Sequence, residues 1–338
     1  MERNKTIDVT KGIAIILVVI GHCIQYGMGS SWINNWYFFH DVIFKLIYGL
    51  HMPLFILISG YLFFSTIKKR NTIEIIKSRI FNILIPIFLW VILYKIIDLL
   101  IFEKPFIFDT FFYDFFNSLW FLWAIFYISL IVLFVNKIFK DNIFIYVLIN
   151  ILLLLLTDKY NIALYSYLYP YFIIAYFYHK YQTKINQFLY KINDYIKILI
   201  SGLSYFILMS FYNINCYIYI GGFSIINKDI LPQLKIDIYR YAVGFFGCIF
   251  ILSLITMILK SKPRKEWKTL TILGQNSLAI YTVSCYLNCN LLLLLTPNAP
   301  SNYYVVIIES ILMIGICLIF ATLIKKIRIL NKLLLGGR

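Results

Sequence analysis

The chain has 338 residues, of which 62% are hydrophobic and only 14% charged, and its mean hydropathy is +0.83. These values exclude a water-soluble globular domain and are typical of a polytopic membrane protein. The net charge of +16 does not indicate nucleic-acid binding, because lysine and arginine fall mainly in the short gaps between apolar runs.

Apolar runs of about 17 to 25 residues predict transmembrane helices. We expect an all-α integral membrane protein with about ten such helices in one bundle, which makes residues 1–338 a single transmembrane domain. The expected spans are residues 12–29, 36–64, 80–101, 118–135, 142–156, 162–178, 195–212, 236–259, 272–295 and 302–324.

The positive charges alternate between the gaps. The N-terminal segment and every second gap contain 23 of the 31 lysines and arginines. Since short cytoplasmic loops are enriched in these residues, both termini are predicted to be cytoplasmic. We therefore expect a multi-pass protein of a cell membrane, such as a bacterial inner or plasma membrane. The first run has a basic flank like a signal peptide, but it lacks a small-residue cleavage site and is expected to remain as a span.

The first span carries polar residues on one face. In IDVTKGIAIILVVIGH (7–22), Lys11 and His22 are separated by a whole number of helical turns to within roughly 20°, and Asp8 lies on the same stripe. His22 is expected ~15 Å into the helix, near the bilayer midplane, with Asp8 and Lys11 at the cytoplasmic edge. An ionisable group at that depth is a functional candidate. The alternative is a basic anchor with one hydrogen-bonded core histidine.

The second span contains HMPLFILISGYLF (51–63). Pro53 removes a backbone donor and is expected to interrupt the helix, while Ser59 and Gly60 permit close helix approach. His51 is also expected near the midplane and could face the same cavity as His22. A kinked packing helix with a satisfied histidine is the alternative.

Three pairs of opposite charge lie at i, i+3 or i, i+4 spacing within the expected spans, and such pairs can neutralise each other locally. They are Asp41 with Lys45, Lys95 with Asp98, and Asp237 with Arg240.

Further along the chain, KSRIFNILIPIFLW places Lys77 and Arg79 at the cytoplasmic start of the third span. Arginine matches phosphate oxygens, although a basic inner loop is expected in any case. Trp120, in SLWFLWAIF, is typical of an interfacial aromatic belt. Asn276, in LGQNSLAIY, is typical of a helix cap.

Together these segments resemble the membrane-bound acyltransferase 3 family, particularly its fucose 4-O-acetylase-like branch. The resemblance runs from residue 7 to about 284 and rests on the spacing of Lys11 and His22 with the preceding Asp8, on HMPLFILISGYLF, on Arg79 with LIPIFLW, and on WFLWAIF, YPYFIIAYF, Arg240 with Gly244, and LGQNSLAIY. Two positions depart from the family: Ala175 stands where many relatives have glycine, and Ser284 where many have histidine. The second departure puts the role of that helix in acceptor binding in doubt.

The resemblance implies an O-acyltransferase that moves acetyl from cytoplasmic acetyl-CoA to a sugar hydroxyl of a cell-surface polysaccharide or its lipid-linked precursor. Acetyl-CoA is then a donor substrate, the other partners are the glycan acceptor and membrane lipid, and no nucleic acid is involved.

The resemblance also implies roles for single residues. His22 is the expected general base, because imidazole is mostly neutral at pH 7. Asp8 orients Lys11 or the entrance, and it is too far along the helix to touch His22. His51 and Ser59 are expected to donate hydrogen bonds to the thioester oxygen. Lys11, Arg79 and Lys77 are expected to hold the CoA phosphates, and Trp120, Arg240 and Asn276 to bind the acceptor.

No metal is expected, because the six cysteines are scattered without metal-ligand spacing or a CxxC pair. The main alternative function is a transporter or flippase of glycan precursors that performs no acyl transfer. Intramembrane charges and a broken helix also fit that class, but the sequence shows no pseudo-symmetric pair of interrupted helices. A sensor or scaffold is a further alternative, against which the lack of a sizeable soluble domain argues.

Overall fold

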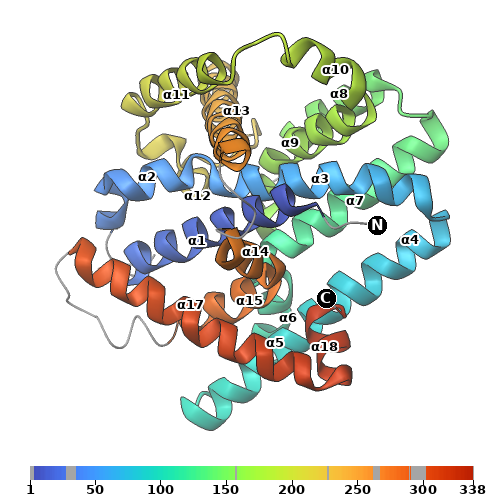
Figure 1. Cartoon of the computed structure of the whole chain (residues 1–338). Helices are drawn as coiled ribbons and strands as arrows, with labels where there is room; N and C mark the ends of the chain where they lie inside the picture. Colours follow the sequence, from blue (N-terminus) through green and yellow to red (C-terminus); the bar gives the residue numbers. More distant parts are fainter. Residues whose placement is uncertain are drawn as a thin grey trace. The chain divides into compact units, whose positions relative to one another are not determined.

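The computed structural model describes residues 4–27, 36–156, 158–226, 228–261, 267–288, 290 and 302–337. Within these ranges the regular elements are all helical, and no β-strand occurs (Figure 1). Six helical segments are long and apolar enough to cross a membrane. They are α1 (Lys5–Gly27), α2 with α3 (Val42–Tyr48 and His51–Lys69), α4 with α5 (Thr72–Arg79 and Ile85–Ile101), α7 (Trp120–Phe139), α13 (Ile230–Ser261) and α17 (Tyr303–Lys326).

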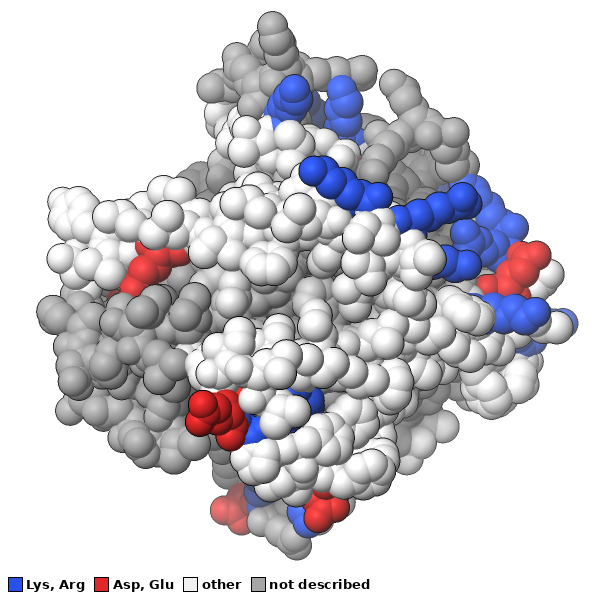
Figure 2. Space-filling view, turned by 90° about the horizontal axis from the view of Figure 1, so that it is seen from below, with Lys and Arg blue, Asp and Glu red and all other residues white. Residues whose placement is uncertain are grey.

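A seventh span is present if α10 (Gln182–Leu189) and α11 (Asp194–Ser210), which meet at 96°, form one broken crossing. α8 (Ile143–Leu154) and α15 (Ser277–Leu287) are shorter apolar helices, and α9 (Ile162–Lys180) is longer and contains Pro170. An integral membrane helical protein is thus supported, and the count of ten spans stays a prediction. Among the described residues that are visible in Figure 2, most are uncharged.

The chain forms two compact units. The first consists of residues 1–55, 190–212 and 242–326, and the second of residues 56–189, 213–241 and 327–338. The boundaries pass through α3 and α13, each of which is one continuous helix. The single domain predicted over residues 1–338 stays a prediction.

In the first unit α1 packs against α2, α15, α17 and, most closely, α14 (Lys268–Gln275). A Cβ at Gly12 would overlap the carbonyl of Leu270, and a Cβ at Gly274 would overlap the carbonyl of Asp8. Two glycines, one on each helix, therefore let the backbones of α1 and α14 meet directly.

In the second unit a glycine likewise lets the backbones of α3 and α9 approach closely. A Cβ at Gly60 would overlap the carbonyl of Phe172, so the close helix approach expected at this glycine is confirmed. α9 also packs against α7 and α8, and α18 (Arg328–Leu335) packs against α5, where Trp90 Nε1 donates to the carbonyl of Leu334 at 2.9 Å.

The interruption in the second expected span lies at Gly49 and Leu50, between α2 and α3, and the proline is not its site. Pro53 is the third residue of α3, and in the first turn its missing N–H costs no intrahelical hydrogen bond. The expected position of the break, at Pro53, is therefore wrong. The span is divided, but the division lies before the proline.

Several expected gaps contain short helices that hydropathy did not reveal. α4 and α10 lie in gaps of this kind, as do α6 (Phe108–Asn117) and α18. The remaining elements are the 3₁₀ helices η1 (Trp36–His40), η3 (Lys159–Asn161) and η4 (Ile214–Cys216), the π-helix η2 (Ile80–Leu84) and the one-turn α12 (Ile218–Gly221).

Candidate functional site

His22 lies in the C-terminal half of α1 and is partly buried. Its Nδ1 is buried and has no hydrogen-bond partner among the described residues. The ring makes an edge contact with Tyr26, one helical turn further on, with centroids 6.0 Å apart. A buried imidazole nitrogen without a protein partner is costly unless a ligand or water completes it. Among the described residues, His22 thus keeps a buried ring nitrogen available to a ligand.

His51 begins α3 and is buried, with 4% of its surface exposed. Its Nδ1 lies 2.8 Å from the carbonyl oxygen of Ile47. Because a carbonyl only accepts, Nδ1 must carry the proton, and in the neutral ring Nε2 is then an acceptor. His51 lies within electrostatic range of His22. The structure thus brings together the two histidines that the sequence singled out.

Glu309, on α17, was missed in the sequence analysis because it stands alone in a long apolar run. Both carboxylate oxygens are buried and lack a hydrogen-bond partner among the described residues. Glu309 lies close enough to Cys23, the neighbour of His22 in α1, for their charges to interact. A single carboxylate within an expected span was the signal that could have identified it.

Asp8 and Lys11 lie near the start of α1. Asp8 is 3% exposed, and its Oδ2 accepts a hydrogen bond of 3.4 Å from Gln275 Nε2 at the end of α14. Lys11 is half-buried. The glycine contact described above holds this end of α1 against α14, so Asp8 is fixed between the two helices.

Lys77 and Arg79 end α4 in the second unit. Lys77 is exposed, whereas Arg79 is half-buried and its guanidinium lies over the ring of Phe63 at 4.7 Å. The π-helix η2 follows Arg79 directly, and such wide turns often accompany functional sites. Ser59 is half-buried on α3 in the same unit. Trp120, which begins α7, packs against a small apolar cluster that includes Ala163 and Phe223.

Arg240 forms a saturated network on α13. Its Nη1 donates to Asp237 Oδ1 at 2.7 Å, so the expected pair of Asp237 and Arg240 is confirmed. The other donors reach three backbone carbonyls, of Cys216 at 2.7 Å, Gly222 at 2.5 Å and Asn215 at 2.7 Å. Arg240 is 3% exposed, and its bonds fix the segment before α13. This geometry indicates a structural role for Arg240. Its role in acceptor binding stays a prediction.

Asp158 fixes the same segment from the connection between α8 and α9. Its Oδ1 accepts from the backbone N–H groups of Phe223 and Ser224 at 2.9 and 2.8 Å, and its Oδ2 pairs with Lys228 at 2.8 Å. Burial alone would raise the pKa of this carboxyl, but the bonds from Lys228 and the two backbone groups outweigh burial and hold it below its ordinary value. Gly222 adopts φ +62°, and a Cβ there would overlap the Asp158 carboxylate.

Asn276 lies between α14 and α15 but does not cap α15 with its side chain. Instead its Nδ2 donates to the carbonyl of Ile272, and its Oδ1 accepts from Lys325 on α17 at 2.8 Å. The expected helix cap is therefore wrong. Its role in acceptor binding is untested and stays a prediction.

The two other predicted charge pairs have different partners in the structure. Lys95 pairs with Asp114 at 2.6 Å, and Asp98 pairs with Lys104 at 3.7 Å. Asp41 caps α2 by accepting from the backbone of Phe44. In both regions a helix or turn absent from the expected topology brings in a nearer partner.

Of the predicted site residues, Asp8, Lys11, His22, His51 and Asn276 belong to the first unit, and Ser59, Lys77, Arg79, Trp120 and Arg240 belong to the second. In the described ranges, no group of three His, Cys, Asp or Glu side chains is placed to hold a metal ion.

Comparison with known proteins gives a family match over nearly the whole chain. A family model described as an acyltransferase domain, Acyl_transf_3, matches residues 4–328. Two proteins named nodulation protein NolL are similar over a shorter stretch. The one from Sinorhizobium fredii is 42% identical over 89 residues, which are 26% of this chain and 24% of the relative. The one from Mesorhizobium japonicum is 37% identical over 93 residues, 26% and 23% of the two chains. The matched part thus spans about a quarter of each relative. No solved structure matches this chain.

Proposed function

The chain belongs to the acyltransferase 3 family, and from this premise we propose that it is a membrane O-acetyltransferase. It moves acetyl from cytoplasmic acetyl-CoA to a sugar hydroxyl of a cell-surface polysaccharide or its lipid-linked precursor. It does so as a multi-pass protein with ten spans and cytoplasmic termini, in a bacterial inner or plasma membrane. The observation that carries the proposal is the imidazole of His22, which retains a buried nitrogen without a partner among the described residues.

In the proposed reaction His22 is the general base. The acceptor hydroxyl gives its proton to the imidazole while its oxygen attacks the thioester carbon of acetyl-CoA. The carbon–sulfur bond then breaks, the acetyl group stays on the sugar oxygen, and the CoA thiolate takes up the proton that His22 accepted. An imidazole is suited to this exchange because its ordinary pKa, ~6.5, lies close to neutral pH.

His51 takes a role different from the one that the resemblance implies. Its Nδ1 proton is engaged by the carbonyl of Ile47. The neutral ring therefore has no second N–H to offer to an oxyanion, and it can only accept at Nε2. In the proposal His51 orients the acceptor by accepting a hydrogen bond from a hydroxyl, and Ser59 remains the candidate donor to the thioester oxygen.

The donor is held by cations in the proposal. Lys11 and Arg79, with Lys77 near the surface, bind the phosphates of CoA, because guanidinium and ammonium groups form strong charge-assisted hydrogen bonds with phosphate oxygens. Asp8 keeps the start of α1, and with it Lys11, in place through Gln275. Trp120, Arg240 and Asn276 are the candidate contacts of the acceptor.

The test uses the purified protein in phospholipid nanodiscs with radiolabelled acetyl-CoA and a polysaccharide or lipid-linked glycan fraction. The proposal predicts label on the glycan, released by mild base as expected for an O-ester. A flippase or transporter would leave the glycan unlabelled while moving it across the membrane of a proteoliposome. Absence of label with every glycan tested, together with such movement, would reject the enzyme.

A further inference from the structure

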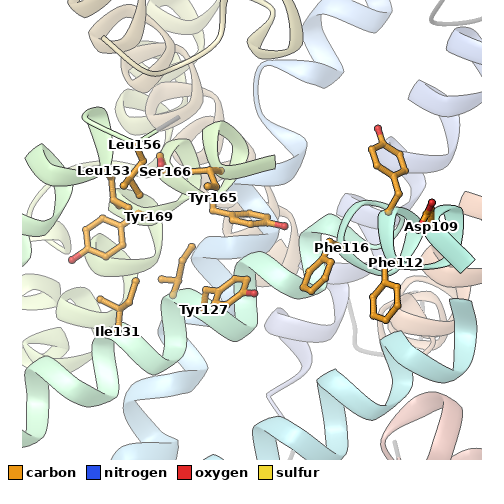
Figure 3. Close-up of a pocket in the computed structure, with 13 residues that line it drawn as sticks. Asp109, Phe112, Phe116, Tyr127, Ile131, Leu153, Leu156, Tyr165, Ser166 and Tyr169 are labelled. Carbon is orange, nitrogen blue, oxygen red and sulfur yellow. The ribbon is translucent and has the colours of Figure 1, made fainter. Parts of the chain in front are cut away.

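A hollow region lies in the second unit, among α6, α7, α8 and α9. It is a pocket of 760 Å³, within the range of about 300–1,000 Å³ that is usual for small-molecule sites. Figure 3 shows its long shape: Leu153, Leu156 and Ile131 lie toward one end, Tyr127 and Tyr165 in the middle, and Phe112 and Asp109 at the other end. The aliphatic side chains thus lie at one end of the pocket, together with Tyr169, and Asp109 lies at the other end beside Phe112 and Phe116.

One wall of this apolar pocket carries a hydroxyl without a partner. Ser166 is 1% exposed, lines the pocket, and has no hydrogen-bond partner for its Oγ among the described residues. A buried hydroxyl of this kind is expected to be completed by something that enters the site.

A charged pocket of 710 Å³ adjoins the apolar one at the loop between α5 and α6. The two pockets share Asp109 and Tyr113, so they have a common wall. The other charged residues of this pocket are the ion-paired Lys95, Asp98, Lys104 and Asp114, and its lining also includes Pro105, Phe106, Ile107 and Thr110.

The charges of this second pocket select its ligand. Each lysine forms an ion pair with a carboxylate, Lys95 with Asp114 and Lys104 with Asp98, and Asp109 adds a further negative charge. An anionic phosphate would meet this excess of carboxylates at close range, which is unfavourable. Sugar hydroxyls suit it, because carboxylates accept hydrogen bonds and ammonium groups donate them.

We propose that the two adjoining pockets bind one amphiphilic molecule, with an aliphatic chain between α7, α8 and α9 and an uncharged sugar headgroup at the charged pocket beside α6. This inference goes beyond the proposed function, because none of the residues assigned to acetyl transfer lines either pocket. Tyr113 and Asp109 lie where chain and sugar join, and Asp109 positions the headgroup by accepting from its hydroxyls.

The site is tested by photolabelling in phosphatidylcholine nanodiscs. The probe is dodecyl glucoside with a diazirine on the alkyl chain, and the comparison probe carries the same chain on phosphocholine. The proposal predicts that the glucoside probe labels peptides of α7, α8 and α9 and that unlabelled dodecyl glucoside competes. Labelling that is not saturable, or that is equal for the phosphocholine probe, shows an ordinary lipid contact and overturns the proposal.

Two substitutions test the apolar pocket and the headgroup position separately. Ile131→Trp fills the apolar pocket, and the matched control is Ile138→Trp, an exposed residue about two turns further along the same helix that does not line the pocket. We expect the first to reduce labelling by at least about tenfold and the second to leave it unchanged. Equal labelling in the two variants would overturn the chain site.

Asp109→Asn tests the headgroup. The exposed Asp109 is not needed for packing, and loss of one charge-assisted hydrogen bond is expected to weaken the glucoside probe about tenfold. The phosphocholine probe should lose nothing, and an equal loss for both probes would overturn the sugar assignment.

The outcome is separable from that of the proposed function. If the glucoside probe fails to label the pocket but label from acetyl-CoA still reaches a glycan, the function stands and the site is wrong. If the probe binds and no acetyl is transferred, the site stands and the function is wrong.

Discussion

Two buried polar regions of this protein differ in how completely they are satisfied. Around Arg240, each of the three guanidinium nitrogens donates to Asp237 or to a backbone carbonyl. Around His22 and Glu309, a ring nitrogen and both carboxylate oxygens lack partners in the described part of the chain. A saturated network stabilises a fold, whereas polar atoms without partners in a membrane are expensive and indicate a site that a ligand completes.

The largest effect is expected at Arg240. Arg240→Ala leaves Asp237 buried without its partner, which should cost about 3–5 kcal/mol. The measurement is the melting temperature of the detergent-solubilised protein. The double variant Arg240→Leu with Asp237→Leu should recover part of the loss, because it also removes the stranded charge. An unchanged melting temperature for the single variant would refute the structural role.

The next effect is expected at Arg79, a proposed contact of the acetyl-CoA donor. Its guanidinium lies over the ring of Phe63 at 4.7 Å. Arg79→Ala should raise the dissociation constant of acetyl-CoA by about tenfold, from loss of a charge-assisted phosphate contact. Arg70→Ala, in the turn before α4, is the matched control and should change it little. Donor affinity that is the same in all three proteins would remove Arg79 from the donor site.

The Asp158 carboxylate, like the Arg240 guanidinium, has hydrogen-bond partners in the structure. Asp158→Asn should lower stability by about 1 kcal/mol, because the side chain is partly exposed and its bonds are screened by water. The lowered pKa of Asp158 fixes the sign of the pH effect: its contribution is present above the ordinary carboxyl pKa and is lost as the pH falls through the lowered value.

Melting temperatures between pH 7 and pH 3 measure this effect. Asp229→Asn, at an exposed position in the same segment, is the control. An acid profile of Asp158→Asn identical to that of the unchanged protein would contradict the assignment.

The smallest effect on stability is expected at Glu309. Glu309→Gln replaces a carboxylate without a described partner by a neutral amide, so the melting temperature should stay unchanged or rise slightly. Acetyl transfer should decrease if the carboxylate serves a ligand. A fall in melting temperature as large as that of Arg240→Ala would show that the Glu309 carboxylate has partners in the protein, which would contradict the contrast with Arg240.

The sequence predicted those features that depend on near neighbours in the chain. The apolar runs of α1 and α17 identify membrane helices without further information, and the spacing of Asp237 and Arg240 predicts their pair. The close approach at Gly60 also follows from the residue type.

Features set by distant partners could not be predicted. The carbonyls that saturate Arg240 lie 18 to 25 residues before it. Lys95 pairs with Asp114 because α6 folds back on α5, and hydropathy gives no sign of that helix. The side chain of Asn276 serves Lys325 on α17 where a local cap was expected. Glu309 was missed because no other charged residue lies near it in the sequence.

The measurement that tests the central claim most directly is the rate of acetyl transfer by folded His22→Ala protein, with acetyl-CoA binding measured on the same sample. Loss of a general base predicts a rate at least about 100-fold lower, with donor binding and melting temperature preserved. Turnover close to that of the unchanged protein would contradict the account, because the reacting hydroxyl would then not need the imidazole of His22.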